Sequence, residues 1–362
     1  MRIIVIGAGI AGLSIGWRLA EGGADVTVLD RANAGRGATW AAAGMIAATA
    51  ESAEASGAEA EFARASAEAW PAFAAEVEEE SGAQIFYRKD GALIAALTQS
   101  EAEAFKARAG AQFIGADEAL RREPMLQPGI AGALWDPNEA QVDNRALSAA
   151  LVTALLRVGG KLSINETAIR FEMEGARIIG VRTPFHVHLA DAFVIAAGAW
   201  TSRIEGLPPG TVPEISPVKG EMISLALPNG ARLPKSLVWG NEIYAVPRQD
   251  RLLIGATAEE AGFDTSLTQI ARNWLHEHAA GLMPAVQHWE IAEHWAGLRP
   301  RARDGLPVLG ASAVESVFVA SGQFRNGILF APLIAAAMCD LVLNRCKPPE
   351  IAGFSPLRAA LT

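Results

Sequence analysis

The chain has 362 residues, of which 51% are hydrophobic and 20% are charged, so it can bury a sizeable core and is long enough for about two domains. The formal net charge of -9 argues against a nucleic-acid-binding protein, because such proteins need a basic surface. The two cysteines, Cys339 and Cys346, form no CxxC pair. This excludes a disulfide framework and a cysteine-rich zinc site, and we expect a cytoplasmic protein.

The N-terminal residues have the pattern of a dinucleotide-binding unit. Residues 2–6 form a largely β-branched run that is typical of a strand buried on both faces, and apolar residues recur at helical spacing from Ile10. Gly7, Gly9 and Gly12 lie at the turn between the two elements. Glycines at this spacing allow a tight turn, close approach of a pyrophosphate to the backbone, and close packing of the helix.

An acidic residue follows the second predicted strand. Residues 25–29 form that strand, and Asp30 comes directly after it. This is about the distance downstream at which a dinucleotide-binding unit places the carboxylate that binds the adenosine ribose. The acid strengthens an otherwise weak glycine motif.

Two patterns alternate along the rest of the chain. Residues 38–75 are rich in Ala and Glu and predict helix, residues 146–158 predict a second helix, and residues 192–200 return to a buried strand. Residues 218–298 instead predict antiparallel strands. We therefore expect an α/β plus α+β protein in which a Rossmann-type domain and a smaller antiparallel-sheet domain are both discontinuous. The predicted limits are 1–84, 145–215 and 300–362 for the first domain, and 85–144 and 216–299 for the second.

The C-terminal region predicts a strand, a glycine loop and a helix that begins near Gly327. The positive end of that helix can stabilise an anion. The apolar run at residues 328–339 is interrupted by Pro332 and is too short to cross a bilayer, so we expect no membrane insertion.

Several motifs together resemble the D-amino-acid oxidase-like family of FAD-dependent amine oxidoreductases. They are GAGIAG with Asp30, TWAAAGM, VIAAGAW, PVKGE, YAVPR, WAGLRP and GQFRNGILFAP, and they cover nearly the whole chain in order. Within the family the likeness is greatest to the glycine-oxidising members of bacterial thiamine biosynthesis. The weakest part of the resemblance is residues 51–84.

The resemblance implies an FAD site that includes the glycine turn, with small residues and Met45 passing close to the flavin ring. Its predicted residues are Gly7, Gly9, Ile10, Ala11, Gly12, Asp30, Arg31, Ala38, Thr39, Ala43, Gly44, Met45, Ile169, Gly198, Gln323, Phe324, Arg325, Asn326, Gly327, Ile328 and Leu329.

The resemblance also implies a site for a small amino acid. Arg299 matches the arginine that binds the substrate carboxylate, a role that suits a guanidinium because it makes two parallel hydrogen bonds. Tyr244 would add a hydroxyl, while Arg325 and Met45 would lie on the substrate side of the flavin. We assign no residue as acid or base.

The implied reaction is oxidative deamination of glycine or another small amine to an imine, which then gives glyoxylate and ammonia or serves thiamine thiazole synthesis, with O2 reduced to hydrogen peroxide. Related enzymes that bind FAD covalently use a cysteine, which is absent from residues 300–310, so we expect noncovalent FAD. His186, His188, His276 and His278 lack the spacing of a ligand set, and we expect no metal.

Other functions remain open at this point. A D-amino-acid dehydrogenase or a sarcosine-type secondary-amine oxidase shares the expected fold. A noncatalytic or tRNA-modifying flavoprotein and an NAD-dependent dehydrogenase are more distant alternatives, and the acidic charge weighs against a nucleic-acid partner. The sequence leaves a homo-oligomer open.

Overall fold

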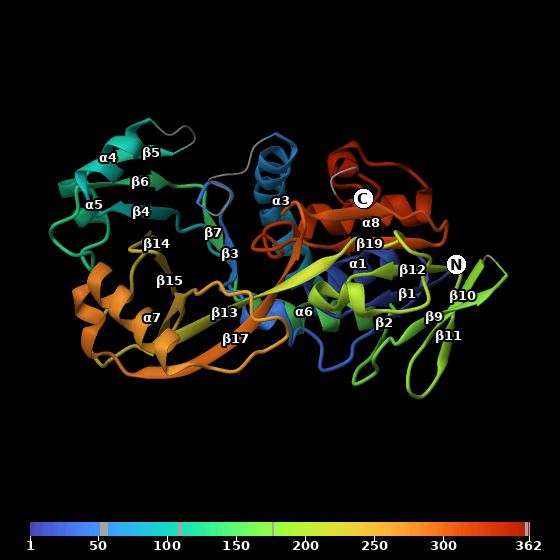
Figure 1. The fold of residues 1–362 in the computed structure, drawn as a ribbon. Coiled ribbons are helices and arrows are strands. Elements are labelled where there is room, and N and C mark those ends of the chain that lie inside the picture. The colour runs from blue at the N-terminus through green and yellow to red at the C-terminus, as the bar shows by residue number, and fades with distance from the viewer. Residues whose placement is uncertain (51–56, 108–110, 176, 359–360, 362) are drawn as a thin grey trace.

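The computed structural model describes residues 1–50, 57–107, 111–175, 177–358 and 361. These residues form two large sheets and two small ones. The two large sheets lie at opposite ends of the molecule, and two long strands of the second sheet, β13 (Ile215–Ala226) and β17 (Ile291–Ala302), extend toward the first (Figure 1).

The first large sheet has six strands in the order β18-β19-β12-β1-β2-β8. Strand β1 pairs in parallel with β2 and β12, as expected for a Rossmann-type unit, and β18 pairs antiparallel with β19. The strands are β1 (Arg2–Ile6), β2 (Asp25–Leu29), β8 (Lys161–Ser163), β12 (Ala192–Ile195), β18 (Val308–Ala311) and β19 (Val317–Ser321).

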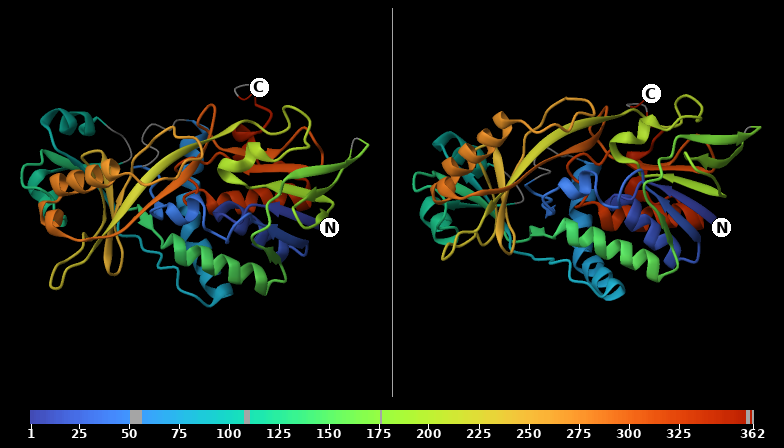
Figure 2. Two further views of the ribbon diagram at one scale, coloured as in Figure 1. Left: turned by 60° about the horizontal axis from the view of Figure 1, so that its bottom comes forward. Right: turned by 90° about the horizontal axis from the view of Figure 1, so that it is seen from below.

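This sheet is covered on both faces. Ile3 and Val5 of β1 pack in the same core cluster as four helices, whereas Ile4 and Ile6 pack in the cluster under a three-stranded sheet. Figure 2 shows that small sheet projecting beside the N-terminus. The covering elements are α1 (Ile10–Glu21), α3 (Ala58–Ser81), α6 (Asn144–Arg157), α8 (Ala331–Asn344), β9 (Arg170–Glu174), β10 (Arg177–Arg182) and β11 (Val187–Leu189), followed by the short turns η1 (Gly198–Arg203) and η3 (Pro349–Phe354).

The second large sheet has eight strands in the order β17-β13-β16-β15-β14-β4-β6-β5, and most neighbours are antiparallel. One face packs on α7, and the other faces Ala41 and Ala43 of the first half. Its remaining elements are β4 (Ala92–Ala96), β5 (Gln112–Gly115), β6 (Gly132–Asp136), β14 (Leu237–Gly240), β15 (Ile243–Pro247), β16 (Arg251–Gly255), α4 (Gln99–Lys106), α5 (Ala116–Arg122), α7 (Gln269–Leu282) and η2 (Pro284–His288).

A short stretch of chain, residues 38–45, lies between the two halves, and we call it the joint segment. It contains α2 (Ala38–Ala41) and the start of β3 (Met45–Ile46), which pairs with β7 (Ala140–Gln141). Trp295 of β17 donates a hydrogen bond from Nε1 to the Ala41 carbonyl at 3.0 Å. A side chain at Gly297 would overlap Ala41, so β17 approaches the joint segment closely.

The structure corrects two predicted elements. The helix expected over residues 38–75 is split, because Ala42 is extended and Gly44 has a left-handed φ of 75°, and α3 begins only at Ala58. Residues 51–56 of that prediction lie outside the described residues. The last helix starts at Ala331 rather than near Gly327, with Pro332 in its first turn, where proline is preorganised for a helix.

Two further predictions hold only in part: residues 218–298, predicted as antiparallel strands, also contain α7 and η2, and the strand predicted over residues 192–200 ends at Ile195. The remaining predicted elements lie close to their expected positions, and the expected fold class is confirmed. The exact limits of the two domains stay a prediction. Among the described residues, no helix is both long enough and apolar enough to cross a membrane.

Gly12→Ala should destabilise the first domain, because the new methyl group would overlap the Gly7 carbonyl directly beneath α1. We expect a loss of at least about 1–3 kcal/mol in urea unfolding, together with a lower FAD content. Gly115→Ala is the control, since Gly115 has a φ of -70° and open space around it. Equal stability of the two variants would contradict the close packing of α1.

Candidate functional site

A cavity of about 740 Å3 lies between the two large sheets. It is lined by the β1–α1 turn, the joint segment, the β12–η1 turn, the facing parts of β13 and β17, and the loop at residues 323–329. The cavity therefore receives residues from both halves of the chain.

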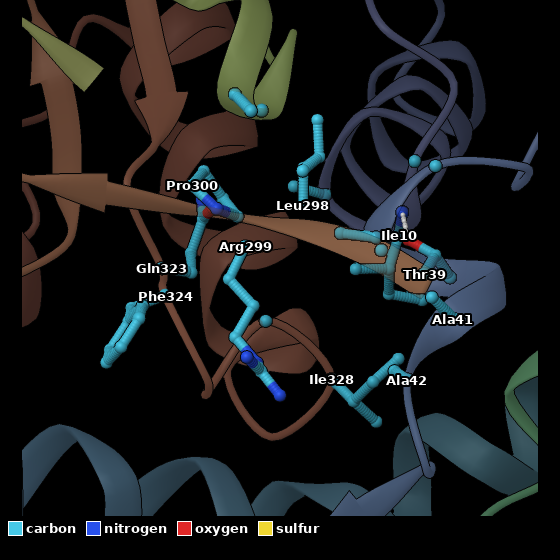
Figure 3. Close-up of a pocket in the computed structure, with 18 of the residues that line it drawn as sticks. Ile10, Thr39, Ala41, Ala42, Leu298, Arg299, Pro300, Gln323, Phe324 and Ile328 are labelled. Carbon is cyan, nitrogen blue, oxygen red and sulfur yellow. Dashed lines mark hydrogen bonds between the residues drawn. The ribbon is translucent and has the colours of Figure 1, made fainter. Parts of the chain in front are cut away.

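The β1–α1 turn can bring its backbone close to a ligand. Gly7 has a φ of 107°, and a side chain there would overlap the Ala196 carbonyl, so only glycine fits. The helix begins after Gly9, which has no side chain to cap the exposed N–H groups, and Thr39 Oγ1 accepts a hydrogen bond from the Ile10 N–H at 2.9 Å (Figure 3). The free end of α1 is suited to an anionic group such as a pyrophosphate.

Asp30 lies beside this turn. Its carboxylate accepts hydrogen bonds from the Ala8 N–H at 2.7 Å and from the Ala32 N–H at 2.8 Å, which fix its orientation. Burial raises the pKa of Asp30, and these two bonds oppose that effect. The neighbouring Arg31 guanidinium lies 3.5 Å from the centroid of the Trp200 ring, and both residues line the cavity. This arrangement suits the ribose and adenine end of a dinucleotide.

Two buried amide side chains in the loop at 323–329 lack partners for some of their polar atoms. Gln323 is 6% exposed and Asn326 is 8% exposed, yet Gln323 Nε2 and Asn326 Oδ1 make no hydrogen bond within the described residues. Buried polar atoms normally have partners. A donor and an acceptor both left unpaired beside the cavity fit a polar heterocycle such as the pyrimidine part of a flavin.

Arg248, in the turn between β15 and β16, bonds to the joint segment and does not itself line the cavity. Its guanidinium donates hydrogen bonds to the carbonyls of Ala43 and Val142 and to the Gln141 side chain. Burial lowers the pKa of Arg248 to about 10, which leaves it charged at neutral pH. Gly44 must be glycine, because a side chain would overlap the Val142 carbonyl. Arg248 thus fixes the wall at residues 43–45 that the sequence predicts to pass close to a flavin ring.

Arg299 projects from β17 on the side opposite to Leu298 and Pro300 (Figure 3). A side chain on the facing Gly220 would overlap its guanidinium, so glycine at 220 provides the necessary room. Arg299 Nη1 donates to the Thr257 carbonyl at 3.0 Å, and this is the only hydrogen bond of the guanidinium among the described residues. The other N–H groups are available to a ligand in the cavity.

Tyr244 lines the same cavity as Arg299. Its ring packs over Gly255, where a side chain would overlap it, and its hydroxyl donates to the sulfur of Met222 at 3.6 Å. Trp239 lies beside the ring with a centroid distance of 6.3 Å. These residues build a compact, largely apolar wall.

All predicted site residues except Gly12 line the cavity. Gly12 packs against the backbone of Gly7 and contributes to the site only by letting α1 come close. Ile169 is 39% exposed and its N–H is already bonded to the Arg182 carbonyl, so that donor is not free for an adenine. Arg325 is exposed, and its guanidinium lies over the Phe324 ring at 5.4 Å.

Several residues at or near the cavity were not predicted. Gly220, which lines the cavity, and Arg248, which lies behind its wall, stand in the motifs PVKGE and YAVPR and could have been singled out there, but no local pattern shows which backbone or guanidinium they contact. Other lining residues that were not predicted are scattered along the chain, among them Arg36, Glu166, Trp200, Arg203, Met222, Trp239, Glu242, Ala256 and Gly297.

A buried acid supports the wall that follows the joint segment. Glu139 is 3% exposed, and its Oε1 accepts a hydrogen bond from the Thr49 N–H at 2.6 Å, next to Ala50 in the cavity wall. Burial raises the pKa of Glu139 to about 8, and the nearby charge of Asp136 acts in the same direction.

Comparison with known proteins identifies the family. The model of a family described as FAD dependent oxidoreductase matches residues 2–341. The chain belongs to this FAD-dependent oxidoreductase family. FAD is therefore its cofactor, and the turn at Gly7, the Asp30 carboxylate and the unpaired amides at 323 and 326 fit that molecule. Neither Cys339 nor Cys346 is among the described residues that line the cavity, and noncovalent binding of FAD stays a prediction.

Individual members of the FAD-dependent oxidoreductase family resemble the chain over almost its full length. A bifunctional ThiO/ThiG protein of Nostoc is 32% identical over 97% of this chain and 54% of its own length, so the chain spans about half of that relative. The glycine oxidase of Geobacillus kaustophilus is 33% identical over 98% of this chain and 96% of its own. The crystal structure of that enzyme has a TM-score of 0.92 and covers 99% of both chains. An iminodiacetate oxidase from Chelativorans has a TM-score of 0.89 at 25% identity, covering 98% of this chain and 99% of its own.

The stability of the protein should depend on the protonation of Glu139. Because its pKa of about 8 exceeds the ordinary value, the folded state binds the proton more tightly than the unfolded state. The stabilisation is complete in acid and is lost as the pH rises toward 8, by at most about 1.4 kcal/mol per pH unit. The free energy of unfolding between pH 5 and 8 should fall more steeply for the wild type than for Glu139→Gln. Parallel pH profiles would contradict this.

Arg248→Met should loosen the joint segment, because it removes hydrogen bonds from a charged group to two carbonyls. We expect unfolding to become easier by about 2 kcal/mol and FAD to bind more weakly, measured by urea unfolding and by titration of the apoprotein with FAD. Arg251→Met on the same hairpin is the control. Arg251 pairs with exposed Asp250, so its loss should change stability by no more than about 0.5 kcal/mol.

Proposed function

We propose that this protein oxidises glycine or a similarly small amino acid to its imine, with FAD as cofactor and O2 as electron acceptor. Hydrolysis of the imine gives glyoxylate and ammonia, and reduction of O2 gives hydrogen peroxide. The proposal is supported by the likeness to glycine oxidases over nearly the whole chain.

One observation carries the substrate assignment. The Arg299 guanidinium has a single hydrogen bond among the described residues, to the Thr257 carbonyl, and it faces the same cavity as the β1–α1 turn. A cation with unused donors inside a cavity recognises a carboxylate, and a guanidinium can hold both carboxylate oxygens at once. The substrate we infer is therefore an amine that bears a carboxylate.

The residues of the chain bind and orient such a substrate. Arg299 takes its carboxylate, the Tyr244 hydroxyl provides a further polar contact, and Gly220 leaves space for the guanidinium between the strands. Bound FAD supplies the hydride acceptor. Holding the α-carbon in one orientation accounts for much of the rate enhancement in reactions of this kind, and we assign no side chain as the base.

The walls around Arg299 favour a small substrate. Met45, Met222, Trp239 and Tyr244 are all large side chains that pack in one cluster, and they line the same cavity as the guanidinium. A pocket of this kind limits the volume beyond the α-carbon. We place the enzyme in thiamine thiazole synthesis and in the cytoplasm, on the likeness to ThiO and the motifs of the sequence.

The reaction is tested by offering glycine, sarcosine and D-alanine to the purified yellow protein while peroxide and oxygen consumption are recorded. The proposal expects glycine to be oxidised with one peroxide formed per oxygen consumed. Reduction of an artificial dye without oxygen uptake would instead indicate a dehydrogenase, and a preference for sarcosine would indicate a secondary-amine oxidase.

Arg299→Met should raise KM for glycine by about 100-fold or more, because two hydrogen bonds from a charged group are lost. The FAD content should stay that of the wild type. Arg299→Lys keeps the charge but not the two-pronged geometry, so its KM for glycine should lie between those of the wild type and Arg299→Met. If KM for glycine is the same in all three proteins, Arg299 does not bind the substrate carboxylate.

A further inference from the structure

A cluster of charged side chains is buried in the second sheet behind the residues of the proposed substrate site. Lys219 is 2% exposed and Glu221 is 1% exposed, and their side chains lie 3.1 Å apart. Glu221 Oε2 also lies 2.8 Å from His294 Nε2. We call Lys219, Glu221 and His294, together with Thr268, the Glu221 cluster. None of its members lines the cavity.

The cluster occupies the opposite face of β13 from the substrate site. Side chains alternate along a strand, so Lys219 and Glu221 point away from the face that presents Gly220 and Met222 to the cavity. Opposite residues of paired strands share a face, and Arg299 pairs with Val218, which places it on the cavity side as well. The cluster can therefore affect Arg299 only through an intermediate.

That intermediate is Thr257, which is bonded to Glu221 twice. The Glu221 N–H donates to Thr257 Oγ1 at 2.8 Å, and the Thr257 N–H donates to the Glu221 carbonyl at 3.2 Å. The Thr257 carbonyl is then the group that accepts the hydrogen bond from Arg299 Nη1. A continuous chain of contacts thus joins Glu221 to the guanidinium.

The Glu221 side chain anchors the far end of the same segment. Its carboxylate accepts hydrogen bonds from the Thr268 N–H at 3.0 Å and from the Thr268 hydroxyl at 3.1 Å, just before α7. Lys219 exchanges two backbone hydrogen bonds with Glu259, both 2.9 Å long. Residues 257–268 are therefore bonded to β13 at three points, namely Thr257, Glu259 and Thr268.

A buried Lys–Glu pair is a poor way to gain stability, because removing two charges from water costs about as much as their attraction returns. Such pairs are better explained by a need for one defined arrangement. We propose that the Glu221 cluster is a positioning device for Arg299: it holds the Thr257 carbonyl in place, and that carbonyl sets the orientation of the guanidinium toward the substrate carboxylate. This inference rests on the proposed function of Arg299.

The planarity of the guanidinium explains why one carbonyl is enough. Its five N–H groups lie in a fixed fork, so fixing one of them at Nη1 restricts the directions of the others. A shift of Thr257 would rotate the fork away from the carboxylate. It would leave in place the β1–α1 turn, Asp30 and the loop at 323–329, which would hold FAD. The expected signature of damage is weaker carboxylate binding with normal cofactor binding.

The test uses the FAD-loaded enzyme and acetate as a carboxylate probe, with its dissociation constant read from the visible flavin spectrum. Thr257→Val removes the hydroxyl that accepts from Glu221 and keeps the shape of the side chain. We expect acetate binding and KM for glycine to weaken at least about tenfold, with kcat and FAD affinity close to wild type. Thr211→Val is the matched control, since Thr211 is a buried threonine, 1% exposed, whose hydroxyl donates to the Pro208 carbonyl outside the site.

A second variant tests the side chains themselves. The double change Lys219→Met with Glu221→Gln removes both charges together, so no unpaired charge is left buried, and it should weaken acetate in the same way. The double variant also tests whether the Glu221 cluster positions Arg299 in the event that Thr257→Val fails to fold.

The outcomes separate the two proposals. If Arg299→Met weakens acetate binding but Thr257→Val and the double variant do not, the positioning role is overturned while the substrate clamp stands. If Arg299→Met leaves acetate binding unchanged, the clamp itself is wrong. Equal losses of melting temperature in Thr257→Val and Thr211→Val with unchanged acetate binding would show a purely structural role and overturn the inference.

Discussion

The site depends on how the joint segment is held between two sheets that are built from different parts of the chain. Trp295 and Arg248 of the second half donate hydrogen bonds to carbonyl groups within residues 38–45. At Gly297 and Gly44 a larger residue would collide with neighbouring atoms, so glycine permits the close approach. A hydrogen bond from a charged guanidinium to a carbonyl group is stronger than one between two neutral groups. Because the wall of the cavity is fixed in this way, cofactor-binding and substrate-binding surfaces keep one relative position.

Strand β17, which forms part of this contact, also carries the arginine of the proposed substrate site. Strand β17 brings Trp295 and Gly297 to the joint segment and Arg299 to the cavity within a few residues. Its neighbour β13 presents Gly220 to Arg299 on one face and the Glu221 cluster on the other. The two strands pair from Ile215 with Ala302 to Leu225 with Ile291, and β13 is buried along most of its length. The contact with the joint segment, the proposed substrate arginine and its proposed support are thus parts of one pair of strands.

Some residues of the site could be predicted from local sequence, and others could not. Gly7, Gly9 and Asp30 follow from a strand, a turn, a helix and a second strand that are consecutive in the chain. The helix predicted over residues 38–75 was wrong because the high helix propensity of alanine was overridden by tertiary contacts that need an extended turn at Ala42 and a left-handed Gly44. The link from Glu221 through Thr257 to Arg299 joins three separate segments and has no sequence signal.

The sequence by itself determined the Rossmann-type unit, because its glycines and Asp30 lie in a short run of residues whose spacing reflects local geometry. The FAD-binding family and the choice of Arg299 came from the resemblance of several motifs to known flavoproteins. Only the tertiary structure decided that Arg248 holds the joint segment and that Glu221 is linked through Thr257 to Arg299. The physical reason is distance along the chain. Contacts between residues separated by tens to hundreds of positions form only when the two sheets are brought together, and no local periodicity records them.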